Sequence, residues 1–356
     1  MTINFVDTFK DRTVLVTGHT GFKGTWLTIW LNMLGAKVIG YSLDPLTNKD
    51  LFVLSGIENK ITDIRGDIRD QHAIENVFEQ YRPEIVFHLA AQPLVKYSYS
   101  HPKETYDVNV MGTMNILEAI RKTDETRVGI FITTDKCYEN KEWVWGYREI
   151  DPVGGYDPYS SSKACSELLV ASYRNSYFNE KNFSEHGKII STVRAGNVIG
   201  GGDWAEDRIV PDSVRAIEKR KPISIRSPKS IRPWQHVLEP LSGYLLLTSQ
   251  ILTHGPAFSG AWNFGPGEEG NVSVENLVSL LVDIWGEGTW EINQQADVHE
   301  ANLLSLDISK AKHQLNWLPK WNIHETIEKT VHWYKSYKNC DIYNLCTNQI
   351  VDYCRE

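Results

Sequence analysis

The chain has 356 residues, of which 41% are hydrophobic and 23% charged, and its formal net charge is −8. This length predicts two lobes, and the composition is typical of a soluble globular protein. The negative charge argues against nonspecific nucleic-acid binding, although it leaves room for a local basic pocket that binds an anionic ligand.

Short apolar runs alternate with longer amphipathic runs through the first half of the chain. The apolar runs, which we predict to be strands, are residues 13–17, 37–42, 84–90, 128–134 and 188–195. The amphipathic runs, which we predict to be helices, are residues 23–34, 73–81, 105–122 and 160–178. Strands that alternate with helices of this length imply crossovers and a parallel sheet covered on both faces. The predicted fold class is therefore α/β, a Rossmann-type doubly wound sheet that binds ligands beyond the carboxyl ends of its strands.

Three glycines, Gly18, Gly21 and Gly24, lie between the first predicted strand and the first predicted helix. Glycines at this place let the backbone turn tightly and approach a pyrophosphate, which the free N–H groups at a helix N-terminus then bind. Asp44 follows the second strand, where a carboxylate binds both ribose hydroxyls and repels a 2′-phosphate. The pattern predicts a dinucleotide site that prefers NAD to NADP.

Another strand end, the sequence GDIRD, adds Asp67 and Ile68 as candidates for holding the adenine. A helix cap before residue 70 is an equally simple interpretation of this segment. His19 and Lys23 stand inside the glycine loop, and they are either solvated bystanders or residues that change how firmly NAD is held. The candidate cofactor-binding set is Gly18, His19, Gly21, Phe22, Lys23, Gly24, Asp44, Asp67, Ile68, Leu89, Ala90, Ala91, Tyr159 and Lys163.

Tyr159 and Lys163 are four residues apart on a predicted helix, so their side chains lie on one face, a turn apart. A free phenol has a pKa of ~10, but a nearby ammonium and the positive nicotinamide ring both favour the phenolate. Such a tyrosinate can take a proton from a sugar hydroxyl while a hydride leaves for NAD. Because a Tyr/Lys pair at this spacing is common on helix surfaces, the prediction of catalysis depends on the glycine loop and on Thr134, which would hydrogen-bond the same hydroxyl.

Asp135 and Lys136 sit side by side just past the fifth predicted strand. They are either a surface ion pair or a pair of groups that handle protons at the mouth of the sheet. Asp135 can serve as an acid only if a closed site raises the pKa of its carboxyl group, and Lys136 can serve as a base only if it is neutral. A charged Lys136 would instead stabilise an enolate.

The pattern loosens after about residue 196, and shorter predicted helices follow near residues 273–285 and 323–338. We predict a dinucleotide-binding domain over residues 1–188. Residues 189–356 would then form mostly a smaller α/β substrate lobe, whose segments can interleave with the first domain.

Five cysteines, Cys137, Cys165, Cys340, Cys346 and Cys354, show neither a CxxC motif nor a metal-ligand spacing. We interpret them as reduced thiols in a cytoplasmic protein and expect no bound metal. The N-terminus lacks an apolar signal core, and the most apolar stretch, residues 238–252, is too short and too interrupted to span a bilayer, so we expect no membrane association.

Together these motifs resemble the extended short-chain dehydrogenase/reductase family over nearly the whole chain. The matching segments are TGHTGFKG at 17–24, GDI at 66–68, HLAAQP at 88–93, YSSSK at 159–163, RAGNVIGGGD at 194–203 and RPWQHV at 232–237. Within the family the chain resembles the nucleotide-sugar 4,6-dehydratases, and the runs TTDKCYEN and DPYSSSKAC resemble the branch that acts on CDP-glucose. In relatives that use dTDP-glucose the strand ends in Thr-Asp-Glu, whereas Lys136 stands here in place of the glutamate.

The resemblance implies that NAD oxidises C4 of the sugar, that the C5 proton is removed, and that water is lost from C6. Asp135 would protonate the leaving hydroxyl, and Lys136 would act on the C5 proton or the enolate. The residues that match substrate contacts of the family are Asn197, Arg208, Arg232 and His299. Arg208 is as easily explained by a salt bridge to a neighbouring acid. The departures at His19 and Lys23 lead us to expect that NAD exchanges more readily than in relatives that keep it through purification.

The predicted helices 105–121 and 160–178 carry apolar residues on more than one face. In the family these helices pair across a dimer axis, so we expect a homodimer or a dimer of dimers. Three other interpretations stay open: a 4-epimerase or decarboxylase on the same fold, a non-catalytic dinucleotide sensor, and a structural or RNA-binding protein. An epimerase needs Tyr159 and NAD but not an acid and a base at positions 135 and 136.

Overall fold

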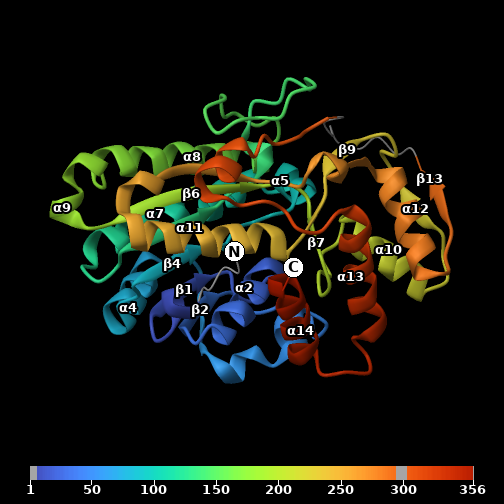
Figure 1. Ribbon diagram of the computed structural model, residues 1–356, viewed down its shortest axis with the longest axis horizontal. Coiled ribbons are helices and arrows are strands. Elements are labelled where there is room, and N and C mark those ends of the chain that lie inside the picture. The colour runs from blue at the N-terminus through green and yellow to red at the C-terminus, as the bar shows by residue number, and fades with distance from the viewer. Residues whose placement is uncertain (1–5, 294–302, 356) are drawn as a thin grey trace.

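A parallel sheet of seven strands forms the centre of the protein, as a computed structural model that describes residues 6–293 and 303–355 shows (Figure 1). The strand order is β11-β6-β5-β4-β1-β2-β3, and every neighbouring pair in it is parallel. The strands are β1 (Thr13–Thr17), β2 (Lys37–Ser42), β3 (Thr62–Arg65), β4 (Ile85–His88), β5 (Val128–Ile132), β6 (Ile189–Ala195) and β11 (Gly260–Phe264). This arrangement confirms the predicted α/β fold class.

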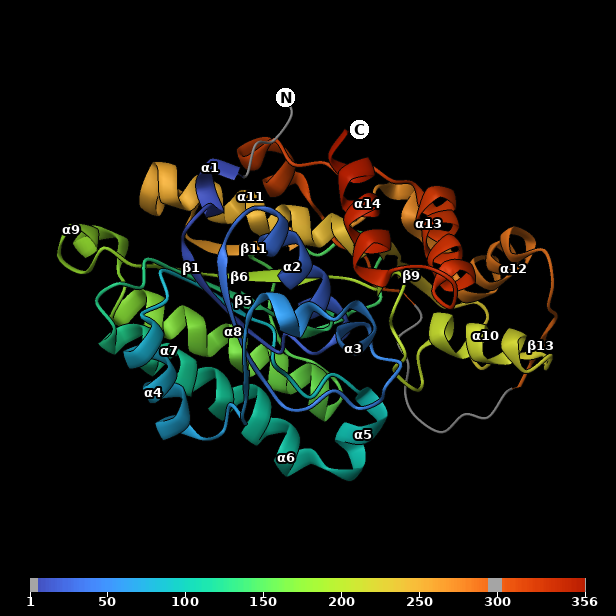
Figure 2. The same ribbon diagram turned by 90° about the horizontal axis from the view of Figure 1, so that it is seen from below.

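Two layers of helices cover the sheet, because successive residues of each strand point to opposite faces. Along β1, Val14 and Val16 pack on the side of α2 (Phe22–Met33) and α11 (Leu238–His254). Leu15 packs on the other side, with α4 (Gln71–Tyr81), α7 (Gly112–Lys122) and α8 (Pro158–Ser176). Figure 2 shows α11 and α2 on one side of β1, β5 and β6, and α4, α7 and α8 on the other.

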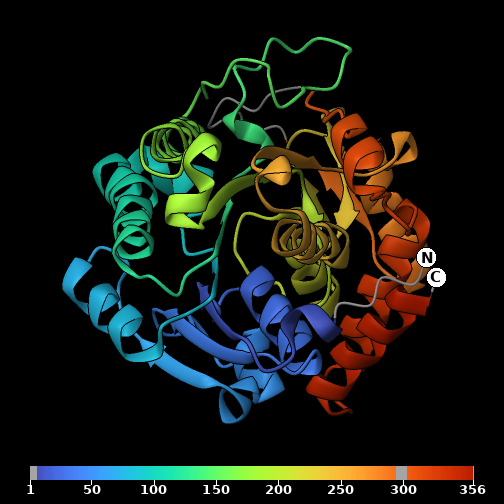
Figure 3. The same ribbon diagram turned by 60° about the vertical axis from the view of Figure 1, so that its left-hand side comes forward.

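The remaining helices connect or flank these layers. They are α1 (Val6–Phe9), α3 (Leu51–Ser55), α5 (Val95–Ser100), α6 (Pro102–Tyr106), α9 (Phe183–His186), α10 (Ile209–Glu218), α12 (Val274–Trp285), α13 (Ile323–Ser336) and α14 (Ile342–Arg355). A π-helical turn, Asp107–Met111, joins α6 to α7, so the predicted helix over residues 105–122 is present but starts earlier and contains a wide turn. Figure 3 shows the last helices beside the first elements of the chain, and α14 packs against α2.

A smaller group of elements, α10, α12 and α13 with three two-stranded sheets, lies beyond the carboxyl ends of the main strands (Figure 1). The paired strands are β7 (Val198–Ile199) with β10 (Gln235–His236), β9 (Ile231–Pro233) with β12 (Asn271–Ser273), and β8 (Ile223–Ile225) with β13 (Trp290–Ile292). This group places residues 197–232 opposite the glycine loop.

The predicted boundary at residue 188 does not follow the edge of the main sheet, because β6 and β11 both belong to that sheet. The apolar stretch 238–252, considered only as a possible membrane segment, forms the buried helix α11. No helix in the described part of the chain is long and apolar enough to cross a bilayer. Residues 189–356 thus supply two strands, β6 and β11, to the main sheet and the helix α11 to one of its covering layers.

Candidate active site

A cavity of about 1880 Å³ opens at the carboxyl ends of the main strands and is lined from both halves of the chain. It brings together nearly every residue that the sequence predicted for a site. The predicted residues on its wall are Gly18, Gly21, Phe22, Lys23, Gly24, Asp44, Asp67, Ile68, Leu89, Ala90, Ala91, Thr134, Asp135, Lys136, Tyr159, Lys163, Asn197, Arg208 and Arg232. Such a cleft at the switch in strand order is where doubly wound sheets bind ligands.

The glycine loop has the close packing that a dinucleotide site needs. Gly18 has a φ of +73°, and a Cβ added to it would lie 2.7 Å from the backbone nitrogen of Ala90. A Cβ on Gly24 would lie 2.0 Å from the carbonyl oxygen of Gly18. Gly21 is the N-cap of α2 and brings no side chain to compete for the N–H groups of the first turn. The loop therefore fits a pyrophosphate held at a helix N-terminus.

The acidic residues at the strand ends differ in their surroundings. Asp44 is largely exposed and lies 3.5 Å from Arg65, while Asp67 forms a short ion pair with Arg69 that lowers the pKa of its carboxyl group. The helix cap considered for this segment is Asp70, whose side chain accepts a hydrogen bond from the backbone of Ala73. Asp44 and Asp67 both line the cavity, each beside an arginine.

The structure corrects the prediction for His19, whose side chain is fully buried away from the cavity. Its Nε2 lies 2.7 Å from Asp63 Oδ1, and its ring meets Phe52 edge-on. A Cβ on Gly40 would strike this ring, so His19 packs against β2 rather than against a cofactor. Lys23 does line the cavity, and burial, with help from Arg208 and Lys163, lowers the pKa of its ammonium group to about 7.

Tyr159 and Lys163 are fixed at the first turns of α8. Asp157 caps this helix by accepting a hydrogen bond from the backbone of Ser160, and Pro158 occupies its first position. The side chains of Tyr159 and Lys163 are both buried on the cavity wall. Lys163 Nζ donates to the carbonyl oxygen of Ile132, 3.1 Å away at the end of β5, so α8 and the strand end are locked together.

The electrostatics around Tyr159 differ from the expectation. Burial raises the pKa of its phenol to about 12, and a hydrogen bond with Thr134 and the charge of Arg208 act against this rise. Lys163, which was predicted to lower this pKa, is not among the groups that shift it most, and burial lowers the pKa of its own ammonium group to about 8. The protein alone therefore holds a neutral phenol, and the phenolate needs a further positive charge beside it.

Glu167, one more turn along α8, completes a buried polar cluster that we did not predict from the sequence. Its carboxylate accepts hydrogen bonds from Thr133, from Thr192 and, at 2.7 Å, from Arg194. These partners lower the pKa of the Glu167 carboxyl group, and its negative charge favours the charged form of Lys163. The repeat of Tyr159, Lys163 and Glu167 at steps of four was the available signal, because it places all three on one face of a helix.

The carboxyl group of Asp135 is buried in the site, and one of its two oxygens has no described hydrogen-bond partner. Thr134 Oγ1 donates to Asp135 Oδ1 at 2.9 Å, but Oδ2 is buried without a hydrogen-bond partner among the described residues. Burial raises the pKa of this carboxyl group, while Lys136, Thr134 and Arg232 oppose the rise. A raised pKa makes the protonated form of a carboxyl group easier to reach, as a proton donor requires.

Three of the four predicted substrate residues lie on the far wall of the cavity, and His299 lies outside the described residues. Arg208 Nη1 donates to Asp203 Oδ2 at 3.0 Å, so the alternative of a local salt bridge is correct for it, although it still faces the cavity. Arg232 is mostly buried, close enough to Asp135 to affect the pKa of its carboxyl group. Among residues 6–293 and 303–355, no three histidine, cysteine or acidic side chains gather so as to hold a metal ion.

This fold, with a glycine loop, a buried tyrosine and lysine on one helix, and an acid at the end of β5, defines an enzyme of the extended short-chain dehydrogenase/reductase class. The chain belongs to the family described as GDP-mannose 4,6 dehydratase, whose model it matches over residues 15–257. This membership confirms the resemblance seen in the motifs.

Two curated relatives show which members of the family the chain is similar to. The chain is 48% identical to the CDP-glucose 4,6-dehydratase of Salmonella typhimurium, over 97% of each chain. It is 27% identical to a dTDP-glucose 4,6-dehydratase of Xanthomonas campestris, over 90% of this chain and 93% of the relative.

Solved structures show the same fold. A UDP-glucose 4-epimerase of Thermotoga maritima with UDP-glucose superposes with a TM-score of 0.76 at 24% identity, over 92% of this chain and 100% of the other. A dTDP-glucose 4,6-dehydratase of Bacillus anthracis in complex with NAD gives a TM-score of 0.75 at 21% identity, over 94% and 99%.

Proposed function

We propose that this protein uses NAD to dehydrate CDP-glucose to CDP-4-keto-6-deoxyglucose. One observation carries the proposal: Oδ2 of Asp135 is buried and has no hydrogen-bond partner among the described residues. Asp135 lines the same cavity as Tyr159, Lys163 and Lys136. An epimerase of the same fold has no need for a protonated carboxyl group there. The 48% identity to a CDP-glucose 4,6-dehydratase supports the choice of nucleotide.

The residues of the chain divide the chemistry among them. NAD, when bound, supplies the hydride acceptor for C4, the hydride donor for C6, and a positive charge beside Tyr159. Tyr159 would take the proton of the C4 hydroxyl as the C4 hydride leaves for NAD, and the C4 ketone that results acidifies the C5–H bond. Lys136 acts at C5, as the base in its neutral form or as the electrostatic partner of the enolate in its charged form. Asp135 would give its proton to the C6 hydroxyl, which leaves as water. A hydride then returns to C6 and a proton returns to C5, so the sugar loses one water in total.

Incubation of the purified enzyme with CDP-glucose and NAD, followed by alkali, tests this function. A 4-keto-6-deoxy product develops ultraviolet absorbance in base, whereas a 4-epimer does not. Parallel reactions with dTDP-glucose and UDP-glucose test the nucleotide. An epimer as the product would overturn the dehydratase, and faster turnover of another nucleotide sugar would overturn only the choice of CDP.

We also expect bound NAD to exchange readily with solvent. Lys23 lies in the loop beside Gly24, and burial lowers the pKa of its ammonium group to about 7, which disfavours the charged form that would attract a pyrophosphate. We expect purified enzyme to need added NAD for full activity. Full activity without added cofactor would contradict this expectation.

We further propose that the protein acts in the cytoplasm as a homodimer or a dimer of dimers. Its five cysteines are all free thiols, which suits a reducing compartment. Leu168 of α8 is 60% exposed and Met111, just before α7, is 45% exposed. These side chains offer an apolar surface on the helices that the family pairs across a dimer axis.

A further inference from the structure

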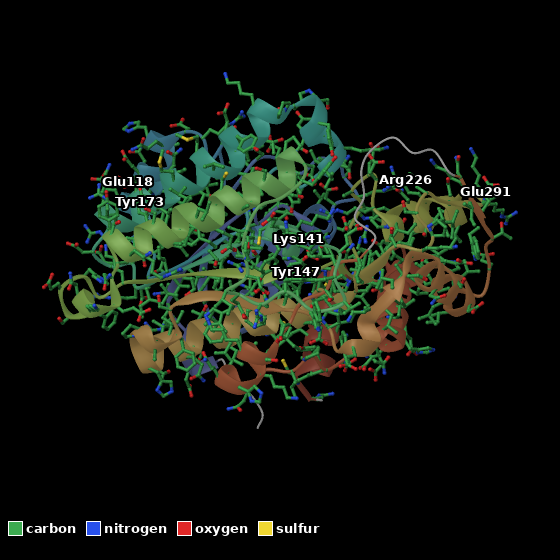
Figure 4. All side chains as sticks on the ribbon, turned by 90° about the horizontal axis from the view of Figure 1, so that it is seen from above. Glu118, Lys141, Tyr147, Tyr173, Arg226 and Glu291 are labelled. Atoms are coloured by element: carbon green, nitrogen blue, oxygen red, sulfur yellow. The ribbon has the colours of Figure 1, made fainter. Side chains whose placement is uncertain are left out.

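A bridge of three charged side chains crosses the mouth of the cavity. Lys96 Nζ lies 2.9 Å from Asp207 Oδ1, and Arg226 Nη1 lies 3.3 Å from the same oxygen. Lys96 belongs to α5 in the first half of the chain, Asp207 precedes α10, and Arg226 follows β8. All three line the cavity, and Figure 4 shows Arg226 on the same side of the molecule as Glu291 of β13, in the smaller group of elements. The bridge therefore ties together the two sides between which a substrate must lie.

One carboxylate oxygen between two cations marks a position where a negatively charged oxygen is stabilised. The side chains of Lys96, Asp207 and Arg226 are 41%, 44% and 36% exposed, so water screens both ion pairs and they are weak. A diphosphate carries more charge than one carboxylate and offers several oxygens, to which an arginine can donate two parallel hydrogen bonds. A diphosphate is thus a stronger partner for these two cations than Asp207 is.

Arg208, another arginine on this wall, has a different kind of partner. Arg208 is held by the mostly buried Asp203, at 3.0 Å. Lys96 and Arg226, by contrast, share a single exposed carboxylate from a residue with a φ of +60°, on a short loop before α10. A side chain on such a loop can turn away while the two cations keep their place.

We propose that Lys96 and Arg226 bind the diphosphate of the nucleotide sugar, and that Asp207 holds them in the empty site until the diphosphate replaces its carboxylate. This inference rests on the proposed nucleotide-sugar function. It adds two residues to substrate binding and makes Asp207 a competitor of the substrate. Removing the charge of Asp207 should tighten binding, whereas removing either cation should weaken it.

Calorimetric titration with CDP and with CMP tests the proposal without turnover. We expect Lys96→Met and Arg226→Met each to raise the Kd of CDP about tenfold and to shrink the preference for CDP over CMP. Asp207→Asn, which suits a left-handed backbone, should lower the Kd of CDP about threefold. The Kd of NAD should not change in any of the three variants.

A matched control is Lys122→Met, which removes a similar exposed ion pair, 2.7 Å from Glu75, outside the cavity. It should leave the Kd of CDP unchanged. Weaker CDP binding by Asp207→Asn would overturn the proposal in favour of a structural clamp, and unchanged binding by the two cation variants would reduce the bridge to a surface contact. Weaker binding of NAD alone would assign the cations to the cofactor.

The two proposals fail in different ways. If wild-type enzyme binds UDP or dTDP but not CDP, the proposed substrate is wrong. The same variants, measured with the nucleotide that does bind, then decide whether the carboxylate of Asp207 holds the two cations until a diphosphate replaces it.

Discussion

At the scale of single residues, Asp135 is the group whose chemistry can be separated from the rest of the reaction. An Asp135→Asn variant keeps the shape of the side chain but has no acidic proton to give to the C6 hydroxyl. We expect C4 oxidation to continue, with NADH absorbance building up, while dehydration slows by about a hundredfold or more. Rapid mixing with CDP-glucose, followed at the NADH band, measures both steps. Equal loss of oxidation and dehydration would contradict the role of an acid.

The same carboxyl group sets the sign of a pH effect. Burial raises its pKa, so Asp135 carries its proton at low pH and loses it as the pH rises through that raised value. An acid must be protonated to act, so the dehydration step of the wild-type enzyme should fall on the alkaline side. In Asp135→Asn this fall should be absent from the residual dehydration rate.

Tyr159 shows which part of a site a sequence can predict. The spacing to Lys163 correctly predicted that both side chains face one cavity, because helical geometry alone fixes that. The predicted lowering of the phenol pKa by Lys163 was not found, since burial dominates and raises it to about 12. Burial, and the opposing effects of Thr134 and Arg208 on this pKa, depend on groups that only the folded chain brings close, and no local pattern carries that information.

At the scale of elements, α11 meets the last helix of the chain through a buried acid, Glu239. Its carboxylate accepts hydrogen bonds from the backbone of Lys320 and Trp321 and from the hydroxyl of Tyr353 on α14. Burial nevertheless raises the pKa of Glu239 to about 7. The group therefore takes up a proton on folding in slightly acidic solution, because the unfolded chain has an ordinary glutamate.

A stability measurement can detect this proton. Between roughly pH 5 and pH 7 the Glu239 carboxyl group is protonated in the native state and ionised in the unfolded chain. The free energy of unfolding therefore falls as the pH rises through this range, by about 3 kcal/mol in all, and this loss levels off above pH 7. Glu239→Gln should remove most of that fall. Urea unfolding of both proteins at several pH values checks it, and an identical pH dependence in the two would contradict the assignment.

The elements themselves were predicted unevenly. Strands β1 and β2 have the bounds that the sequence predicted, because each is a short apolar run with polar ends. The helix α11 was not predicted, because its own residues are apolar on nearly every face and leave no amphipathic period to detect. Pairing of β11 with β6 joins residues about 70 positions apart, and such long-range partners leave no signal in a single sequence.

At the scale of the whole molecule, exposed apolar residues on the helices around α8 predict self-association. A Leu168→Glu variant places a charge on a side chain that is 60% exposed in the single chain. We expect it to elute from a sizing column as a monomer of 40.7 kDa, whereas wild type elutes as a dimer or larger. Leu318→Glu changes a side chain that is 53% exposed elsewhere and should leave the assembly intact.

The strand β11 has a consequence for how the protein is made. Until residue 264 has left the ribosome, β6 has an open edge, and until residue 254 has left it, one face of the emerging sheet lacks the cover of α11. Premature termination before residue 264 would release an aggregation-prone chain rather than an independently folded domain. We therefore expect a fragment ending near residue 188 to be insoluble, and chaperones to be engaged during most of its synthesis.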